Sequence, residues 1–323
     1  MNRRDFISKS SQTGLALSLL GMYACKNGEK KTIEVPFFKL SLAQWSLHKA
    51  IRDAKTLSAF DFAIKAKELG FEGLEYVNQL YEIDKNNKLA SVRNLTKELK
   101  LRSDDTGMTN VMIMIDHEGD LSVSDKVGRD KAIQDHIVWV DAAAELGCSS
   151  IRVNLFGDPG EKDVQAWHHG SVDGMGRLSE YASKSNINVI VENHGGLSSH
   201  GGYVAKVLKE INMPNCGSLP DFGNFCVRQE SGERWGENCI EQYDVYQGVA
   251  DLLPYAKGIS AKTFDFDKEG NEVTFDYVRL MQMIKDSGFN GFIGVEYEGN
   301  NLSEEAGILA TKELLLKVKK VLT

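Results

Sequence analysis

The sequence is poor in the residues that build multi-metal centres. It has seven histidines in 323 residues, too few to favour a multi-zinc site made mainly of imidazoles. Its five cysteines show no C-x-x-C spacing, which argues against a zinc knuckle. A basic excess is also missing: the net charge is -8, whereas phosphate binding needs a basic surface. We therefore expect no nucleic-acid partner.

The N-terminal region has an apolar run, Leu15–Ala24, that is too short to span a membrane as an ordinary helix. It follows the arginine pair Arg3-Arg4 and ends at Cys25, a layout that resembles a twin-arginine export signal. We expect residues 1–32 to be this signal and a tether, and residues 33–323 to fold. Export to the periplasm follows as an expectation. Cys25 is a candidate for lipidation, the one link to a membrane that we expect.

Four further cysteines follow the signal: Cys148, Cys216, Cys226 and Cys239. In an oxidising compartment, Cys226 is able to pair with either Cys216 or Cys239. Buried free thiols fit the same sequence equally well.

Strand-like and helix-like apolar spacings alternate along the rest of the chain. Strands are expected at Leu40–Leu47, Phe71–Val77, within Leu101–Ile115, and at Ser150–Leu155, Ile187–Gly196, Cys216–Leu219, Ala256–Thr263 and Gly291–Tyr297. Helices are expected at Ala54–Leu69, Asn86–Lys100, Asp125–Leu146, Asp173–Asn186, Gly202–Ile211, Tyr243–Leu253, Phe275–Ser287 and Glu304–Leu322. Eight such units predict a single α/β domain, a (β/α)₈ TIM barrel. An open doubly wound sheet is the alternative, weakened by the missing glycine-rich motif after the first strand.

Polar side chains mark the ends of these strands, where a TIM barrel places its functional groups. They are Glu75, His117, Arg152, Asn154, Glu192, His194, Asp221, Lys262 and Glu296. Three of the carboxylates, Glu192, Asp221 and Glu296, are expected to face a common centre. Without compensation they would repel one another and raise each other's pKa. One divalent metal ion (manganese, magnesium, cobalt or zinc) would remove that repulsion and act as a Lewis acid.

Five short motifs follow one another on successive strand ends. They are G-F-E-G-L-E at Gly70–Glu75, V-E-N-H-G-G at Val191–Gly196, P-D-F-G-N-F at Pro220–Phe225, A-K-T-F-D-F-D at Ala261–Asp267 and G-V-E-Y at Gly294–Tyr297. Together they resemble the sugar phosphate isomerase/epimerase superfamily, the xylose-isomerase-like TIM barrels. The resemblance implies that Glu192, Asp221 and Glu296 are metal ligands. It also implies that Glu192 and Glu296 are the acid/base pair.

Two positions depart from that family's pattern. Ser260 and Asn224 stand where the family often has histidines. We expect His194 to complete the metal site, with His200 or a water molecule as alternatives.

Other strand-end residues have two interpretations each. Lys262 either acts on substrate, by a hydroxyl contact or proton donation, or forms a salt bridge with Asp221 or Glu296. Arg152 either binds substrate or pairs with Glu192, and Glu75 either holds a substrate hydroxyl or binds Arg152.

Further substrate contacts are expected from Asn154, Asn224, His117 and Trp45. Trp45 is also one of four candidate platforms for a sugar face, with Phe156, Trp167 and Phe222, of which we expect one to be used. The pair His168-His169 is expected in a solvated loop after the fourth strand.

The leading functional hypothesis is a metal-dependent isomerase or epimerase that transfers a proton next to a sugar carbonyl. The first alternative is a lyase or hydrolase that cleaves 3-keto-glycosides by elimination, favoured by the export signal because phosphorylated sugars are scarce outside the cytoplasm. The second is a non-catalytic periplasmic carbohydrate-binding barrel. The expected partner is a small sugar, and a homo-oligomer is compatible with the sequence.

Overall fold

The computed structural model describes residues 37–236 and 238–322. The expected signal and tether, with Cys25, lie outside these residues. Among the helices of the described part of the chain, we find none with the length and apolar character needed to cross a membrane.

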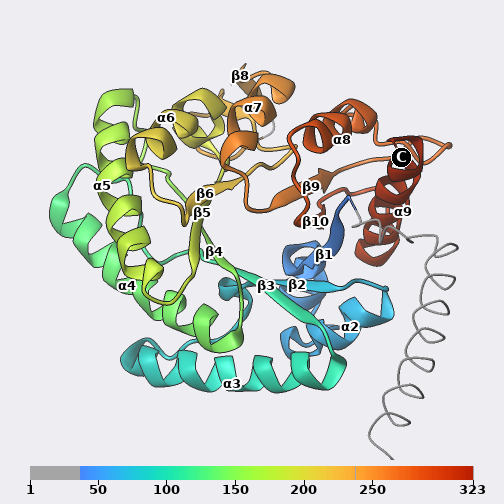
Figure 1. Cartoon of the computed structure of the whole chain (residues 1–323), viewed down its shortest axis with the longest axis horizontal. Coiled ribbons are helices and arrows are strands. Elements are labelled where there is room, and N and C mark those ends of the chain that lie inside the picture. The colour runs from blue at the N-terminus through green and yellow to red at the C-terminus, as the bar shows by residue number, and fades with distance from the viewer. Residues whose placement is uncertain (1–36, 237, 323) are drawn as a thin grey trace, which may run out of the picture. The chain divides into compact units, whose positions relative to one another are not determined.

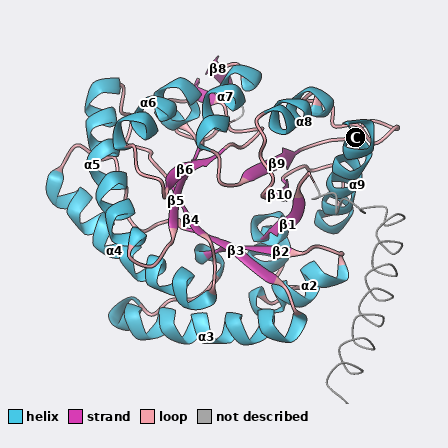
Figure 2. Ribbon diagram, viewed as in Figure 1, coloured by secondary structure: helices cyan, strands magenta, loops and turns pink. Residues whose placement is uncertain are grey.

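Eight parallel strands form the inner ring of the domain (Figures 1 and 2). They are β1 (Lys39–Ala43), β2 (Gly73–Val77), β3 (Thr109–Met114), β4 (Ser150–Val153), β5 (Asn188–Glu192), β6 (Cys216–Leu219), β9 (Ile259–Thr263) and β10 (Phe292–Tyr297). Their order in the sheet is β6-β5-β4-β3-β2-β1-β10-β9. Isolated parallel bridges, Ser218–Ala256 and Asp221–Ser260, link β6 to β9 and nearly close the ring. The predicted TIM barrel is therefore confirmed.

Helices form an outer ring around the strands (Figure 2). They are α2 (Phe62–Glu68), α3 (Lys88–Thr106), α4 (Lys126–Leu146), α5 (Val164–Ser183), α6 (Gly201–Ile211), α7 (Val245–Leu252), α8 (Tyr277–Asp286) and α9 (Glu304–Leu322). Aspartates cap four of the helix starts, for example Asp125 on α4, whose carboxylate accepts from two backbone N–H groups. Gly147 ends α4 in the left-handed conformation, which glycine adopts without strain.

Side chains alternate between the two faces of each strand, and this alternation positions the site. On β5, Val189 and Val191 face the helices in the large core, whereas Ile190 lies in a smaller cluster inside the barrel with Met112 and Leu219. Glu192, two residues after Ile190, therefore also faces the barrel interior. The same period directs Lys262 on β9 and Glu296 on β10 into the barrel, because Ala261 and Val295 lie in the large core.

Several predicted helix boundaries were wrong, among them the end of α3, at Thr106 rather than Lys100, and the starts of two helices. Helix α5 begins at Val164 rather than at 173, because Asp163 caps it there with bonds to two backbone N–H groups. His168 and His169 therefore lie on a helix and not in a loop. The first helix begins at Phe62 rather than at 54. Residues 49–53 form a separate π-helical turn, and Lys55 takes a positive φ of 53° that ends it.

A hairpin of β7 (Cys226–Gln229) and β8 (Cys239–Gln242) was not predicted. It is antiparallel and separate from the barrel sheet. A disulfide between Cys226 and Cys239 joins its strands, which is one of the two pairings considered from the sequence. Cys148 and Cys216 are buried free thiols.

Candidate active site

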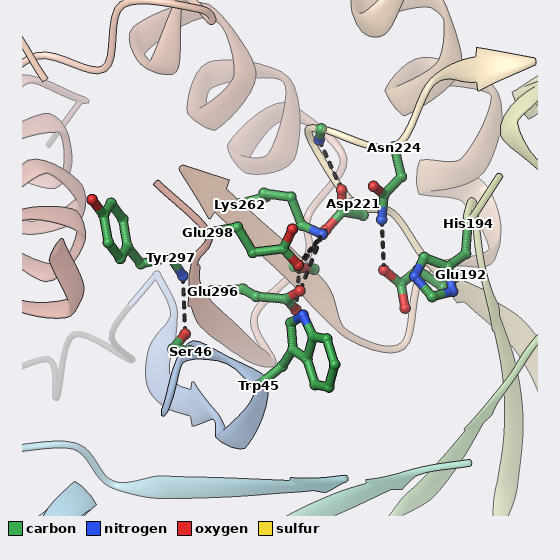
Figure 3. Close-up of polar contacts among 12 residues, drawn as sticks. Trp45, Ser46, Glu192, His194, Asp221, Asn224, Lys262, Glu296, Tyr297 and Glu298 are labelled. Atoms are coloured by element: carbon green, nitrogen blue, oxygen red, sulfur yellow. Dashed lines mark hydrogen bonds and ion pairs between the residues drawn. The ribbon is translucent and has the colours of Figure 1, made fainter. Parts of the chain in front are cut away.

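The ends of β6, β9 and β10 bring one lysine and three carboxylates together (Figure 3). Lys262 Nζ lies 3.1 Å from Glu296 Oε1, 3.2 Å from Glu298 Oε1 and 3.5 Å from Asp221 Oδ2. The Ser260 hydroxyl donates to Asp221 Oδ2 at 2.7 Å and lies 3.3 Å from Glu296 Oε2. We call these five residues the lysine cluster. The predicted salt bridge of Lys262 is therefore present, with both expected partners and with Glu298.

Burial and charge set the protonation states of the lysine cluster. Burial opposes the charged form of Lys262, but Asp221 and Glu296 outweigh it and raise the lysine pKa well above its ordinary value. Burial also raises the pKa of Asp221 and of Glu296, while Lys262 lowers both. Repulsion from Glu296 adds to the rise at Asp221, and repulsion from Glu298 adds to the rise at Glu296. The lysine is thus a fixed cation among carboxylates that it helps to keep ionised.

A second charged group lies at the ends of β4 and β5. Arg152 forms an ion pair with Glu192, with Nε 2.9 Å from Oε2, and bonds Asp116 Oδ1 at 2.8 Å through the NH1 nitrogen. Asn224 donates to the other Glu192 oxygen at 3.0 Å. Burial raises the pKa of Glu192 despite Arg152, whereas Arg152 lowers the pKa of Asp116 to about 2 against the effect of burial. Of the two interpretations of Arg152, the structure shows the pairing with Glu192, and Asp116 is a second carboxylate partner.

His194 is held as a neutral imidazole. Its Nδ1 lies 2.7 Å from Asn154 Oδ1, an acceptor that also receives Arg152 at 3.2 Å. Nδ1 therefore carries the proton, and Nε2 keeps its lone pair. Burial, followed by repulsion from Arg152, lowers the pKa of His194 well below its ordinary value. The imidazole is available to accept a hydrogen bond from a ligand.

The predicted metal ligands do not gather as a metal site. Asp221 and Glu296 share Lys262 and Ser260, Glu192 is paired with Arg152, and His194 bonds Asn154. Within residues 37–236 and 238–322, no group of three or more His, Cys, Asp or Glu side chains is placed to hold a metal ion. Lys262 already supplies the positive charge that an ion would bring to Asp221 and Glu296. The residues in this arrangement do not fit the predicted ion, and metal binding stays a prediction.

A cavity of about 1020 Å³ opens above these groups. Predicted site residues on its wall are Trp45, His117, Asn154, His194, Asn224 and Lys262. Glu192, Asp221 and Glu296 are buried and do not line it. Of the four candidate aromatic platforms, Trp45 and Phe156 line the cavity, whereas Trp167 and Phe222 are fully buried in the core.

Glu75 lies inside the barrel and does not line the cavity. It is fully buried, and its Oε1 accepts from Ser41 at 2.5 Å, while Oε2 has no partner among the described residues. A Cβ on Gly294 would fall 2.4 Å from the Glu75 carboxylate, so glycine makes room for it. Burial raises the pKa of Glu75 to about 8. It does not bond Arg152 directly.

Two other histidines differ in their relation to the cavity. His117 is exposed at its wall and bonds Gln79 at 3.0 Å. His200, the alternative metal ligand, stacks on Tyr203 with ring centroids 3.7 Å apart and lies tilted against Tyr243 at 3.8 Å. It does not line the cavity.

The sequence interpretation missed several cavity residues, among them Glu298, Asp116 and Trp235. Glu298 follows Glu296 by two positions, and the strand period that placed Glu296 inward would have included it. Asp116 directly precedes the predicted site residue His117, and no pattern in the sequence distinguishes it. Trp235 comes from the unpredicted hairpin, and nothing in its local sequence places it at the barrel mouth.

Known proteins resemble this chain in fold at low sequence identity. A 3-keto-D-glucoside 4-epimerase from E. coli, in its apo form, is 15% identical with a TM-score of 0.63, over 86% of this chain and 99% of that one. An L-ribulose 3-epimerase is 12% identical with a TM-score of 0.65, over 88% and 95%. A xylose isomerase-like TIM barrel protein from Mycobacterium smegmatis, in complex with magnesium, is 15% identical with a TM-score of 0.62, over 88% and 98%.

Comparison with curated protein sequences finds no match. The family model for xylose isomerase-like TIM barrels, in contrast, matches residues 64–318, which span most of the described barrel. The motifs on successive strand ends had indicated the same family. The chain belongs to the xylose isomerase-like TIM barrel family.

Proposed function

We propose that this protein is a sugar isomerase or epimerase that moves a proton on the carbon next to a carbonyl group. The observation that supports this most directly is Lys262, a buried cation held by three carboxylates at the wall of a cavity. A fixed positive charge at that place suits the negative charge that develops on a carbonyl oxygen when a neighbouring proton leaves. Two of the similar structures are sugar epimerases, which agrees with this chemistry.

Each cavity group has a distinct role in this proposal. The Lys262 ammonium donates a hydrogen bond to the substrate carbonyl and stabilises the enolate oxygen. Glu298, which pairs with Lys262 and lines the cavity, takes the proton from the adjacent carbon. Return of that proton to the former carbonyl carbon, while the hydroxyl proton passes to the carbonyl oxygen, gives an isomer. A solvent proton added to the opposite face of the adjacent carbon, while Glu298 releases its proton to water, gives an epimer. His194 Nε2 accepts a hydrogen bond from a neighbouring hydroxyl. Glu192 and Glu296, the acid/base pair implied by the family, hold Arg152 and Lys262 in place beneath the cavity.

The proposal includes no step through a metal. The magnesium-bound structure from Mycobacterium smegmatis, and a similar structure with a bound zinc atom, support a metal-dependent version of the same reaction. Elemental analysis of the purified protein, with activity measured before and after chelation, separates the two versions.

Hydrogen exchange with solvent tests the proposal. Ketohexoses and 3-keto-glycosides are incubated with the protein in D₂O, and deuterium on the carbon next to the carbonyl is followed by NMR. We expect exchange with the unchanged protein and about 10²–10⁴-fold slower exchange with Glu298→Gln. Glu313→Gln, at an exposed position on α9, is the matched control.

Three outcomes would contradict parts of the proposal. If deuterium exchange survives Glu298→Gln but is lost in Glu296→Gln, the base is Glu296, as the family resemblance implies, and not Glu298. Binding of sugars without any exchange would favour the non-catalytic carbohydrate-binding barrel. Release of the glycosidic substituent from a 3-keto-glycoside, instead of an epimer, would assign the reaction to the lyase class.

We also propose that the protein works in an oxidising compartment outside the cytoplasm. The support is the export-like sequence at residues 1–32 and the Cys226–Cys239 disulfide, because such bonds are rare in cytosolic proteins. Cell fractionation of the full chain, compared with an Arg3→Lys/Arg4→Lys variant, tests this.

A further inference from the structure

A second part of the cavity wall is aromatic, whereas the lysine cluster is charged. Phe156 from the loop after β4, His194 after β5, and Arg234 and Trp235 from the β7–β8 hairpin line it. We call these four residues the aromatic rim. The His194 and Trp235 ring centroids are 4.7 Å apart, and Phe156 lies 5.7 Å from His194. The Arg234 guanidinium carbon lies 3.7 Å from the Phe156 ring centroid.

The hairpin is held against the strand end by a close backbone approach. Gly195 has a φ of 87°, and a Cβ there would lie 2.7 Å from Arg234 Cγ and 3.0 Å from Trp235 Cη2. Only glycine allows both this conformation and this contact. The Cys226–Cys239 disulfide joins the two strands that present Arg234 and Trp235. The aromatic rim is therefore a built wall of the cavity and not a free loop end.

Two groups of the aromatic rim, the Trp235 indole and the Arg234 guanidinium, are open to a ligand. Trp235 is 50% exposed, although it contacts His194 and Phe156, so a large part of the indole is open. Arg234 stacks on Phe156 and forms no ion pair within 4 Å among the described residues. An indole face and a stacked guanidinium suit a ring that has both an apolar face and hydroxyl groups.

The size of the cavity leaves room for such a ring beside the reacting one. Pockets of about 300–1,000 Å³ hold drug-sized ligands, and this cavity of about 1020 Å³ is at the upper end. A single sugar ring beside Lys262 and Glu298 would leave the aromatic rim uncovered.

Given the proposed function, on which this step rests, we infer that the substrate is a glycoside with two rings. The reacting ring lies at Lys262 and Glu298, and the second sugar ring packs on Trp235 and bonds Arg234. The aromatic rim thus determines specificity for the part of the substrate that does not react.

Calorimetric titration tests this inference without requiring turnover. The full-length protein is titrated with glucose and with the disaccharides cellobiose, maltose, sucrose and trehalose. We expect at least one disaccharide to bind about tenfold more tightly than glucose. Trp235→Ala should remove that advantage and leave glucose affinity unchanged, and Trp235→Phe should keep most of it.

The matched control is Ile240→Ala, on the same hairpin but outside the cavity wall. It should leave every affinity unchanged. Equal affinity for glucose and all four disaccharides in the unchanged protein would overturn the inference, and so would absence of binding. An equal loss for both sugar classes in Trp235→Ala would also overturn it. A two-ring preference without deuterium exchange would support the second-ring subsite while contradicting the proposed reaction.

Discussion

The lysine cluster and the aromatic rim border one cavity but are built in opposite ways. The lysine cluster is charged and attached to the ends of barrel strands. It is buried except for the partly exposed Glu298, and Lys262 is only 1% exposed. The aromatic rim is partly exposed, largely aromatic and attached to loops and a disulfide-linked hairpin. Charges at strand ends are fixed by the fold itself, because strand register places them. Loops between the strands are free to vary, so the difference suggests that reaction chemistry and substrate choice are separable here.

We expect the largest effect from removal of the Lys262 ammonium, the cation of the lysine cluster. Lys262→Met leaves Asp221 and Glu296 buried without their cation, and we expect the free energy of unfolding to fall by about 3–5 kcal/mol at pH 7. Deuterium exchange should fall by about 10²-fold or more. Urea unfolding and NMR measure the two effects. Lys268→Met, at an exposed loop position, is the control. An equally stable variant would show that the lysine does not compensate these carboxylates.

Glu75 gives the second largest expected effect. Its pKa is about 8 in the folded protein and 4.5 ordinarily, so the folded state holds a proton that the unfolded state loses between these values. Its contribution to stability therefore decreases as pH rises from about 4.5 to 8. Glu75→Gln should remove this dependence and stabilise the protein by about 3 kcal/mol near pH 7.

Urea unfolding at pH 5 and pH 8 gives the free energy of unfolding of the unchanged protein and of Glu75→Gln. The difference between the two proteins isolates Glu75, because the other titrating groups contribute to both. Ser41→Ala is a useful comparison, because it removes the hydrogen bond that favours the ionised form of Glu75. A constant difference between the two proteins across this range would show that Glu75 does not titrate there.

Opening the disulfide should affect the aromatic rim alone. In a Cys226→Ser/Cys239→Ser variant, we expect disaccharide affinity to fall about tenfold, because Trp235 and Arg234 lose their fixed position. Glucose affinity and deuterium exchange from small substrates should stay unchanged. Calorimetry and NMR provide the readouts. If disaccharide affinity and deuterium exchange both fell, the hairpin would also support the lysine cluster.

The smallest expected effect concerns the link between Asn224 and Glu192. Asn224→Ala removes one 3.0 Å hydrogen bond, while the Arg152 ion pair with Glu192 remains. We expect a loss of about 1 kcal/mol in the free energy of unfolding and little change in disaccharide preference. Thermal unfolding and calorimetry check both. A much larger loss of stability would mean that Asn224 supports more of the site than this one hydrogen bond.

Strand period explains what the sequence was able to predict. Buried strands such as β5 and β10 have continuous apolar residues followed by polar ends, so the barrel and the inward direction of Glu192 and Glu296 followed from pattern alone. The same pattern did not reveal that Lys262 binds both Asp221 and Glu296, since that depends on how neighbouring strands are shifted.

The hairpin shows why other features were hidden. All four residues of β8 are exposed, so no alternation of apolar and polar residues marks it as a strand. Trp235 lies in the irregular segment between β7 and β8, and only the fold brings it to His194. Glu75 was grouped with the strand-end residues, although it lies two positions before Val77, where both the predicted strand and β2 end, and its carboxylate is therefore buried one layer deeper.

The near-closure of the barrel between β6 and β9 has a dynamic consequence. Only isolated bridges join these strands, and the Ser260 amide donates to the Pro220 carbonyl at 2.9 Å across the gap. Lys262 and Ser260 span the same gap through their bonds to Asp221. A ligand that bonds Lys262 should therefore restrain local opening of the barrel wall. Amide hydrogen exchange at Ser260 and Phe222 would then report occupancy of the cavity from the backbone itself.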